Sequence, residues 1–188
     1  GDLSVVGPIG TGPGDLEQAL DLLAQPLPEM APAYSINLPP ARTTDPKQLR
    51  VAVWSDDELC PVDTEIKAAI EAAAGCLEKL GATVNHQARP NFDIKKYQNN
   101  YRFLLGSSMG GSMPASVFEA MTAVMNSLGE DDTSEMAITA RAIAGPHRDW
   151  AKENERRNQF RKTWAEFFED YDVLLCPSAF VTAFPHDQ

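Results

Sequence analysis

The chain has 188 residues, of which 43% are hydrophobic and 23% are charged, a composition typical of folded globular proteins that argues against wholesale disorder. Its 27 acidic residues outnumber its 16 basic residues, and the formal net charge of -11 argues against binding to nucleic acid or to anionic membrane surfaces. No apolar run approaches the ~20 residues that cross a bilayer and no signal peptide is recognisable, so we expect a cytoplasmic protein that does not bind membranes.

The first 48 residues predict one short helix followed by a linker. Asp15 is placed to cap a helix whose apolar positions run from Leu16 to Leu23, and two prolines that follow shortly end it. Further prolines, mixed with small and polar residues, predict an extended connection rather than regular structure. We therefore divide this part into a first helix region, residues 1–28, and a linker, residues 29–48.

Residues 49–88 have the pattern of a βαβ unit. The segment LRVAVW, from Leu49 to Trp54, is apolar and rich in branched residues, as expected of a strand that is buried on both faces. Asp63 is a suitable N-cap for a helix with apolar residues at three- and four-residue spacing, which Gly81 ends. The segment ATVNHQ predicts a second strand, parallel to the first and reached by a right-handed crossover.

The rest of the chain predicts a helical excursion and a return to the sheet. Residues 89–148 contain three helical patterns, separated by the segment from Gly106 to Pro114 and by the acidic segment GEDDTS. In residues 149–188, a long helix with an aromatic stripe precedes the strand DVLLCP and an irregular loop. The predicted fold class is α/β, with a mixed β-sheet core flanked by helices, and all 188 residues form a single partial domain.

The segment LLGSSMGGS contains a Gly-x-Ser-x-Gly pattern centred on Ser108, which is typical of the nucleophile elbow of serine hydrolases. An elbow requires a strand before the serine and a helix directly after it. Here the preceding apolar residues have helical spacing and Pro114 follows closely, so we favour a Gly/Ser-rich loop between helices. Because Asp172 and His186 follow in the order serine, acid, histidine, an α/β-hydrolase with Ser108 as nucleophile stays open as the least favoured alternative.

Other polar residues have ordinary structural interpretations. His86 occupies a strand position and His147 a helix start, and neither has a recognisable catalytic partner. The acidic clusters at residues 56–58 and 130–132 lack the alternating ligand spacing of a calcium loop. The three cysteines are odd in number and far apart, which favours reduced thiols over disulfides or a zinc site. We therefore expect neither a metal nor a cofactor.

Three ordered segments of the chain resemble the C-terminal half of the amidase signature family. They are DLSVVGPI with the following GDLEQALDLLAQP, the stretch from LRVAVW to LEKLGATV, and RNQFRKTWAEFFEDYDVLLCPSAFVTAFPHD. The resemblance is weak from about residue 90 to 145. It implies a partial amidase-signature fold in an enzyme that hydrolyses a carboxylic amide to an acid and ammonia or an amine. It also implies the catalytic groups: a lysine, a serine beside a cis peptide bond, and a nucleophilic serine.

In that family the three catalytic groups precede the segment that resembles DLSVVGPI. The resemblance therefore implies that this chain is a fragment without catalytic residues, inactive alone, and that the remainder of its own polypeptide supplies them. Where the family usually continues with Ala-Arg-Ser after GPI, residues 10–12 of this chain read GTG.

We expect the substrate-side wall of the parent enzyme in the last segment. Ligands of open α/β sheets bind beyond the carboxyl ends of the strands, so Ser178 and Phe180, directly after DVLLCP, are candidate substrate-binding residues. Trp150, at the start of the long helix, is a further candidate. An equally compatible interpretation is that Phe180 and Phe184 seal the edge of the core.

The expected partners are a small-molecule amide, the rest of the polypeptide and a second copy of the chain, because a fragment exposes apolar surface that favours self-association. The main alternative function is a non-catalytic α/β domain that binds a ligand or partner through the βαβ unit and the loop SAFVTAF.

Overall fold

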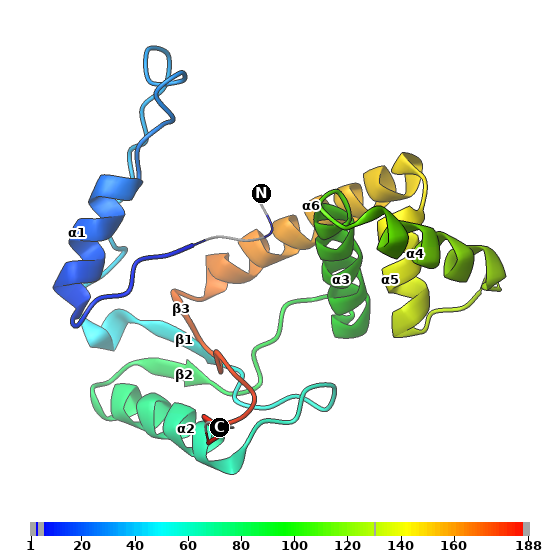
Figure 1. Ribbon diagram of the computed structural model, residues 1–188. Helices are drawn as coiled ribbons and strands as arrows, with labels where there is room; N and C mark the ends of the chain where they lie inside the picture. Colours follow the sequence, from blue (N-terminus) through cyan, green and yellow to red (C-terminus); the bar gives the residue numbers. More distant parts are fainter. Residues whose placement is uncertain (1–2, 4–5, 130, 186–188) are drawn as a thin grey trace. The chain divides into compact units, whose positions relative to one another are not determined.

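The computed structural model describes residue 3 and residues 6–129 and 131–185 (Figure 1). The chain forms two compact units, Gly1–Arg42 and Thr43–Gln188. The first unit contains helix α1, Pro13–Leu23, none of whose residues is buried. Gly12, rather than Asp15, is the N-cap, because Pro13 has the backbone conformation that starts a helix. The Asp15 carboxylate instead accepts hydrogen bonds from the backbone N–H and the hydroxyl of Thr11.

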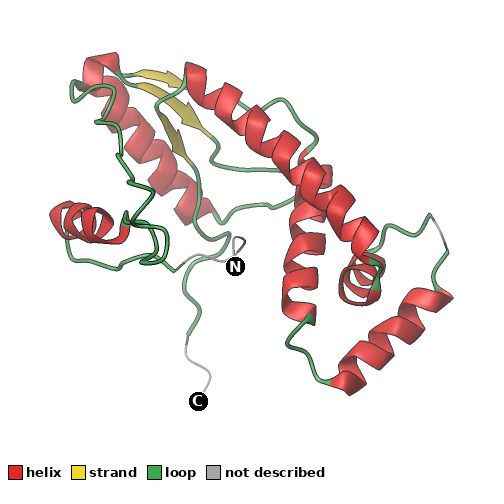
Figure 2. Ribbon diagram, turned by 90° about the horizontal axis from the view of Figure 1, so that it is seen from above, coloured by secondary structure: helices red, strands yellow, loops and turns green. Residues whose placement is uncertain are grey.

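The second unit begins with the short 3-10 helix η1, Pro46–Gln48, and then enters a three-stranded sheet. The strands are β1, Arg50–Val53, β2, Thr83–Asn85, and β3, Val173–Leu175, in the order β2-β1-β3. Both neighbours pair with β1 in parallel, and the strands lie side by side in Figure 2. The predicted α/β class and the parallel βαβ unit are confirmed.

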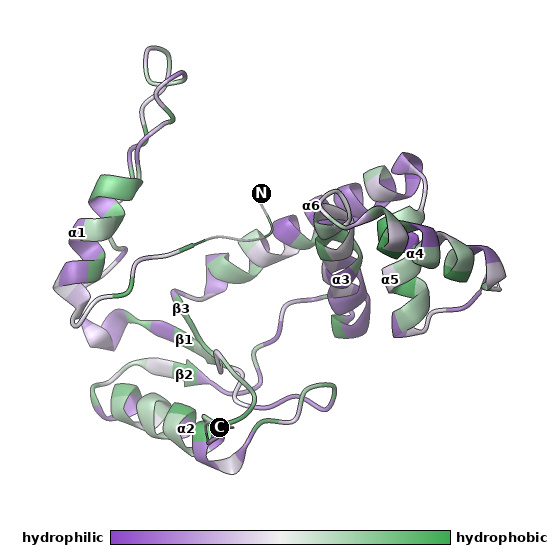
Figure 3. Cartoon of the chain, viewed as in Figure 1, coloured by the Kyte–Doolittle hydropathy of each residue, from purple (hydrophilic) through white to green (hydrophobic). Residues whose placement is uncertain are grey.

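Helices cover both faces of the sheet (Figure 1). Helix α2, Thr64–Lys79, packs against the face that carries Val51 and Val53, and its Ala74 is fully buried there. Helix α6, His147–Asp170, packs against the opposite face, where Phe167 contacts the buried Ala52. Hydrophilic and hydrophobic segments alternate along α6 in Figure 3, as expected of a helix with one buried side. The prediction that the first strand is buried on both faces is therefore confirmed.

An ion pair joins β1 and β3 near the amino ends of the two strands. Arg50, at the start of β1, donates from Nε and Nη2 to the two carboxylate oxygens of Asp172, at 3.0 and 2.8 Å. The backbone N–H of Arg50 donates to the same carboxylate, and the backbone N–H of Asp172 donates to the Arg50 carbonyl. This bidentate contact fixes the register of β3 against β1 over a separation of 122 residues.

The helical excursion consists of α3, Ile94–Gly110, α4, Ala115–Ser127, and α5, Glu135–Ala144. Three helices are present as predicted, but the expected loop from Gly106 to Pro114 is wrong, because α3 continues through Gly110. Small residues occupy this part of α3 because α5 lies against it: a Cβ atom at Gly106 would meet the Ala142 Cβ at 2.9 Å. Gly106 and Gly110 therefore serve close helix packing and not a turn.

One buried polar contact attaches the excursion to the rest of the unit. Asn100 of α3 is 3% exposed, and its Nδ2 donates to the carbonyl and the carboxylate of Glu153 in α6, both at 2.7 Å. An aromatic pair also joins the two helices, because the ring of Tyr97 in α3 packs edge-to-face on that of Phe160 in α6, with 5.2 Å between the ring centroids. These contacts hold the first half of α3 against α6, and α3 thereby becomes one wall of the candidate site.

Candidate functional site

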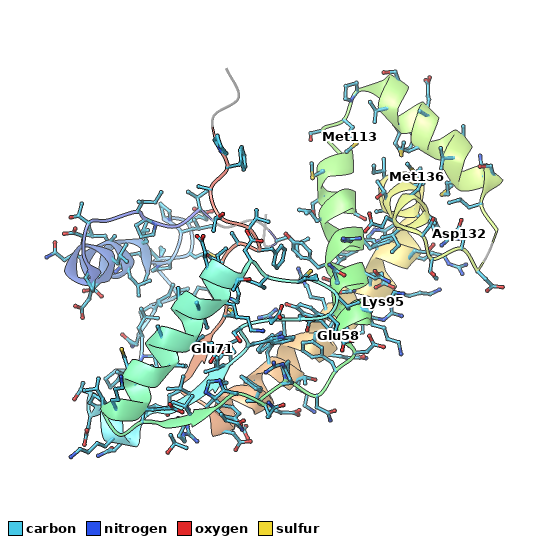
Figure 4. The ribbon with its side chains drawn as sticks, turned by 90° about the horizontal axis from the view of Figure 1, so that it is seen from below. Glu58, Glu71, Lys95, Met113, Asp132 and Met136 are labelled. Atoms are coloured by element: carbon cyan, nitrogen blue, oxygen red, sulfur yellow. The ribbon has the colours of Figure 1, made fainter. Side chains whose placement is uncertain are left out.

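A cavity of about 250 Å³ opens beside the carboxyl ends of β1 and β3. Three segments build it: the loop after β1, the first turns of α3, and the loop after β3. Its lining residues are Trp54, Asp56, Asp57, Leu59, Cys60 and Val62, then Ile94, Tyr97, Gln98 and Tyr101, and finally Cys176, Pro177 and Phe180. Figure 4 labels Glu58 and Lys95, which neighbour lining residues in the loop after β1 and in α3.

The sheet register explains why the first and third segments meet. Val53 pairs with Leu175, so the residues that follow both strands emerge from neighbouring positions at one edge. The backbone N–H of Trp54 continues the ladder by donating to the Leu175 carbonyl at 2.8 Å. Trp54 and Cys176 consequently line the same cavity although they are far apart in the sequence.

The loop after β1 is held by its own two carboxylates. Asp57 accepts hydrogen bonds from the Trp54 indole N–H at 3.1 Å and from the Leu59 backbone N–H at 2.9 Å. Asp56 accepts from Lys67 Nζ at 3.0 Å and from the backbone N–H of Val62 at 3.1 Å. The hydrogen bond from Lys67, assisted by the one from Val62, holds the pKa of Asp56 below its ordinary value. The carboxylates thus order the loop, and each of their four oxygens accepts at least one hydrogen bond.

Arg89 supports Trp54 from outside the cavity. Its guanidinium lies over the indole ring, 4.8 Å from the ring centroid, and Arg89 is not a lining residue. Nη1 also donates to the carbonyls of Val53 at 3.0 Å and Ala88 at 2.7 Å. Partial burial lowers the pKa of Arg89, and the charge of Asp57 acts in the opposite direction. The indole is therefore fixed through both its face and its N–H.

The loop after β3 is attached to the start of α2. Asp63 is the N-cap of α2, as predicted, but its side chain makes no capping hydrogen bond. Its carboxylate accepts from the Thr182 backbone N–H at 3.0 Å, and its backbone N–H donates to the Phe180 carbonyl at 2.8 Å. Asp63 therefore holds Phe180 at the cavity, and its side chain accepts no hydrogen bond from the backbone N–H groups at the start of α2.

The structure brings one of the three predicted substrate-binding residues to the cavity. Phe180 lines it and is 53% exposed. Ser178 is exposed in the same loop and is not a lining residue. Trp150 stacks on His147 at 5.3 Å in the first turn of α6 and does not line the cavity either.

Sequence reasoning missed Trp54, Tyr97 and Tyr101, which line the cavity. The signal for Trp54 was available, since it follows a buried strand just as the Phe180 loop does. The tyrosines lie on a helix whose position depends on long-range packing, so no local pattern indicates them.

Ser108 is not in a nucleophile elbow. It lies within α3, and its hydroxyl donates to the Leu104 carbonyl at 3.0 Å, while Ser107 donates to the carbonyls of Phe103 and Ala142. The residues that lead into this serine are helical, whereas an elbow requires a strand there. His186, the histidine that followed it in the expected order, lies outside the described residues.

A second polar cluster joins Ser55, Glu71 and His86. The Ser55 hydroxyl donates to one Glu71 carboxylate oxygen, and His86 Nδ1 lies 3.2 Å from the other. A nucleophilic serine donates to its base, whereas this serine donates to the acid, so the cluster does not have the geometry of a catalytic triad. Figure 4 shows Glu71 on α2, away from the labelled residues of the excursion.

Within residues 6–129 and 131–185, no group of three or more His, Cys, Asp or Glu side chains is placed to hold a metal ion. None of the helices over the same ranges is long and apolar enough to cross a membrane.

Comparison with known proteins identifies similar sequences. The family model described as Amidase matches residues 2–188. The chain is 26% identical over 204 residues to the A subunit of the glutamyl-tRNA(Gln) amidotransferase of Macrococcus caseolyticus, a match that covers 97% of the chain and 42% of that protein. The same subunit of Thermosynechococcus vestitus is 25% identical over 204 residues, a match that covers 97% of the chain and 42% of that protein.

The corresponding protein of Listeria monocytogenes is 28% identical over 173 residues, which covers 81% of the chain and 36% of that protein. The chain thus spans about two fifths of the length of the first two relatives. No solved structure matches it.

Proposed function

The chain belongs to the amidase family, and on this premise we propose that it forms the substrate-side wall of an enzyme that hydrolyses a carboxylic amide. In such a reaction a serine hydroxyl attacks the carbonyl carbon, and the C–N bond breaks as the departing nitrogen takes up a proton. Water then cleaves the acyl-enzyme ester, so that the overall reaction converts amide and water to acid and ammonia or an amine.

The observation that carries this proposal is the position of the cavity. It lies at the carboxyl edge shared by β1 and β3, which is where open α/β sheets bind their ligands. Phe180 lines it, and we propose that Phe180 contacts the substrate. Ser178, two residues earlier in the same loop, and Trp150 are proposed to face the substrate in the complete enzyme.

We propose that the catalytic lysine and serines come from another part of the polypeptide. Ser107 and Ser108 donate their hydroxyls to backbone carbonyls and Ser55 donates to the Glu71 carboxylate, so none of the three donates to a lysine or histidine nitrogen. The relatives are much longer than this chain, so a polypeptide of their length has room for these groups.

The relatives are named as amidotransferase subunits, and in an amidotransferase the nitrogen released from an amide is passed to an acceptor. The net charge of -11 opposes contact of this part of the protein with a polyanionic acceptor such as tRNA. We therefore favour cleavage of a small-molecule amide as the role that this chain serves.

The experiment compares the 188-residue chain with the full polypeptide that carries it, using a panel of aryl and aliphatic amides. We expect no turnover by the chain alone, and turnover by the full polypeptide. In the full polypeptide, Phe180→Ala should change the ratio of kcat/KM between bulky and small acyl groups and leave the melting temperature nearly unchanged. Turnover by the chain alone that disappears in Ser108→Ala would refute the proposal.

A non-catalytic binding domain is the second candidate, because no serine, lysine or histidine is among the described residues that line the cavity. In that case the full polypeptide binds an amide without turning it over. Isothermal titration of the full polypeptide, run beside the turnover assay, separates these two functions.

A further inference from the structure

The surface of the cavity consists almost entirely of carbon and sulfur atoms. Four aromatic residues contribute to it: Trp54, Tyr97, Tyr101 and Phe180. We infer that the cavity binds an uncharged aryl or branched alkyl group of the ligand and excludes anionic groups. This inference rests on the proposed function, because it identifies the substrate class of the same site.

The two aspartates beside the cavity already have hydrogen-bond partners. The four carboxylate oxygens of Asp56 and Asp57 accept hydrogen bonds from Lys67, the Trp54 indole and three backbone N–H groups. Gln98 Nε2 lies 3.8 Å from Cys60 Sγ. A polar group that entered the cavity would lose its water and find few free partners, so an apolar group fits better.

Charged groups fit the same place poorly. No lysine, arginine or histidine is among the described residues that line the cavity, and the two aspartates that do line it are compensated by Lys67 and Arg89, so a carboxylate or a phosphate would lose its hydration there without meeting a cation. A cation would likewise lose its hydration, and the aspartate oxygens beside the cavity already accept hydrogen bonds from Lys67, the Trp54 indole and the backbone. The uncharged group is therefore the best occupant.

The volume limits the size of the group. A cavity of roughly 150 Å³ already holds benzene, whereas whole drug-sized ligands occupy about 300 Å³ or more. At about 250 Å³, this cavity has room for a substituted ring or a branched alkyl group, which is a part of a substrate and not the whole.

The cysteines allow a direct test that needs no turnover. Cys60 and Cys176 line the cavity, whereas Cys76 lies on α2, is exposed and does not line it. We propose alkylating the chain with neutral N-ethylmaleimide and following each cysteine separately by peptide mass spectrometry. Cys76 serves as the internal control.

Three compounds of similar shape serve as competitors: neutral phenylacetamide, its anionic 4-carboxy derivative and its cationic 4-aminomethyl derivative. We expect phenylacetamide at about four times its Kd to slow alkylation of Cys60 and Cys176 about fivefold and to leave Cys76 unchanged. The anionic compound should not protect either cysteine at the same concentration. Phe180→Ala should weaken protection, whereas Phe184→Ala, which changes an exposed phenylalanine outside the cavity, should not.

Protection by the anionic compound equal to that by phenylacetamide would overturn the inference, as would stronger protection by the cationic compound. Absence of protection up to the solubility limit would show that the cavity is not an aryl site and would also overturn it. Because the readout is binding, the inference can fail while amide hydrolysis is confirmed. Equally, protection can be observed in a protein that hydrolyses no amide.

Discussion

Replacement of Arg89 by alanine should destabilise the fold at the point where the sheet meets the cavity. Arg89 Nη1 donates to the carbonyl of Val53, a residue that is 1% exposed, and the guanidinium covers the Trp54 ring at 4.8 Å. Alanine removes both contacts at once. It leaves a buried strand carbonyl without this donor and one face of the indole without its cover.

The magnitude follows from these two contacts. A hydrogen bond from a charged donor contributes about 1.5 kcal/mol, and a partly exposed cation–π contact contributes about 0.5 kcal/mol, so Arg89→Ala should cost about 2 kcal/mol. Arg89→Lys keeps the charge but not the planar fork, so we expect it to recover less than half of this loss.

Urea unfolding followed by circular dichroism measures the free energy of unfolding, and tryptophan emission reports the environment of Trp54. Trp54→Phe, made in the wild-type and Arg89→Ala backgrounds, isolates the emission of this one indole. Arg148→Ala is the matched control, because the Arg148 side chain is 77% exposed. A loss in Arg89→Ala no larger than in this control, together with unchanged Trp54 emission, would refute the assigned role of Arg89.

Two further predictions concern the carboxylates beside the cavity. Asp63→Ala should release the Phe180 loop at a cost of about 1 kcal/mol and speed hydrogen exchange at the Thr182 amide, while Asp63→Asn, which keeps an acceptor, restores most of the protection; unchanged exchange in the alanine variant would contradict this. Asp56, whose pKa Lys67 lowers, should contribute stability that is present above the ordinary pKa of 3.8 and is lost as the pH falls through the lower folded value. The difference in urea midpoint between wild type and Lys67→Met should therefore shrink between about pH 5 and pH 2, and a constant difference would rule this linkage out.

The parts of the fold that were predictable are those in which local pattern and tertiary role agree. Strand β1 is apolar at three successive positions because its alternate side chains enter two different cores, one beneath α2 and one beneath α6. A continuous apolar run is the pattern that such burial requires, and it is visible in the sequence. The apolar residues of α2 and α6 recur at three- and four-residue spacing, which likewise predicts one buried side for each helix.

The segment GSSMGG misled for a physical reason. Glycine and serine favour turns in isolated chains, but they also let two helices approach closely. At Gly106 and Gly110 an added Cβ atom would meet Ala142 and Ile143 of α5 at 2.9 and 3.4 Å. Only the position of α5 decides between the two roles, and that position depends on contacts remote in the sequence.

Of the loops that line the cavity, only the one after β3 was predictable from the sequence. The rule that ligands bind beyond the carboxyl ends of strands indicates Phe180, which lines the cavity, because the strand that became β3 is recognisable in the sequence. The same rule includes Trp54 only when β1 is known to be the direct neighbour of β3, and pairing between residues 51 and 173 is not encoded in any local pattern.

The loops at the sheet edge and helix α3 both supply residues to the cavity wall, but they differ in how easily their positions can change. Trp54 is held by the sheet ladder and by Arg89, and Phe180 is held to Asp63, so neither position can move without breaking backbone hydrogen bonds of the fold. Tyr97 and Tyr101 instead lie on α3, which is attached through side chains to α6. Differences in the size of the group that the cavity accepts should therefore arise from substitutions on α3. The part of the cavity wall that the sheet edge supplies should stay the same.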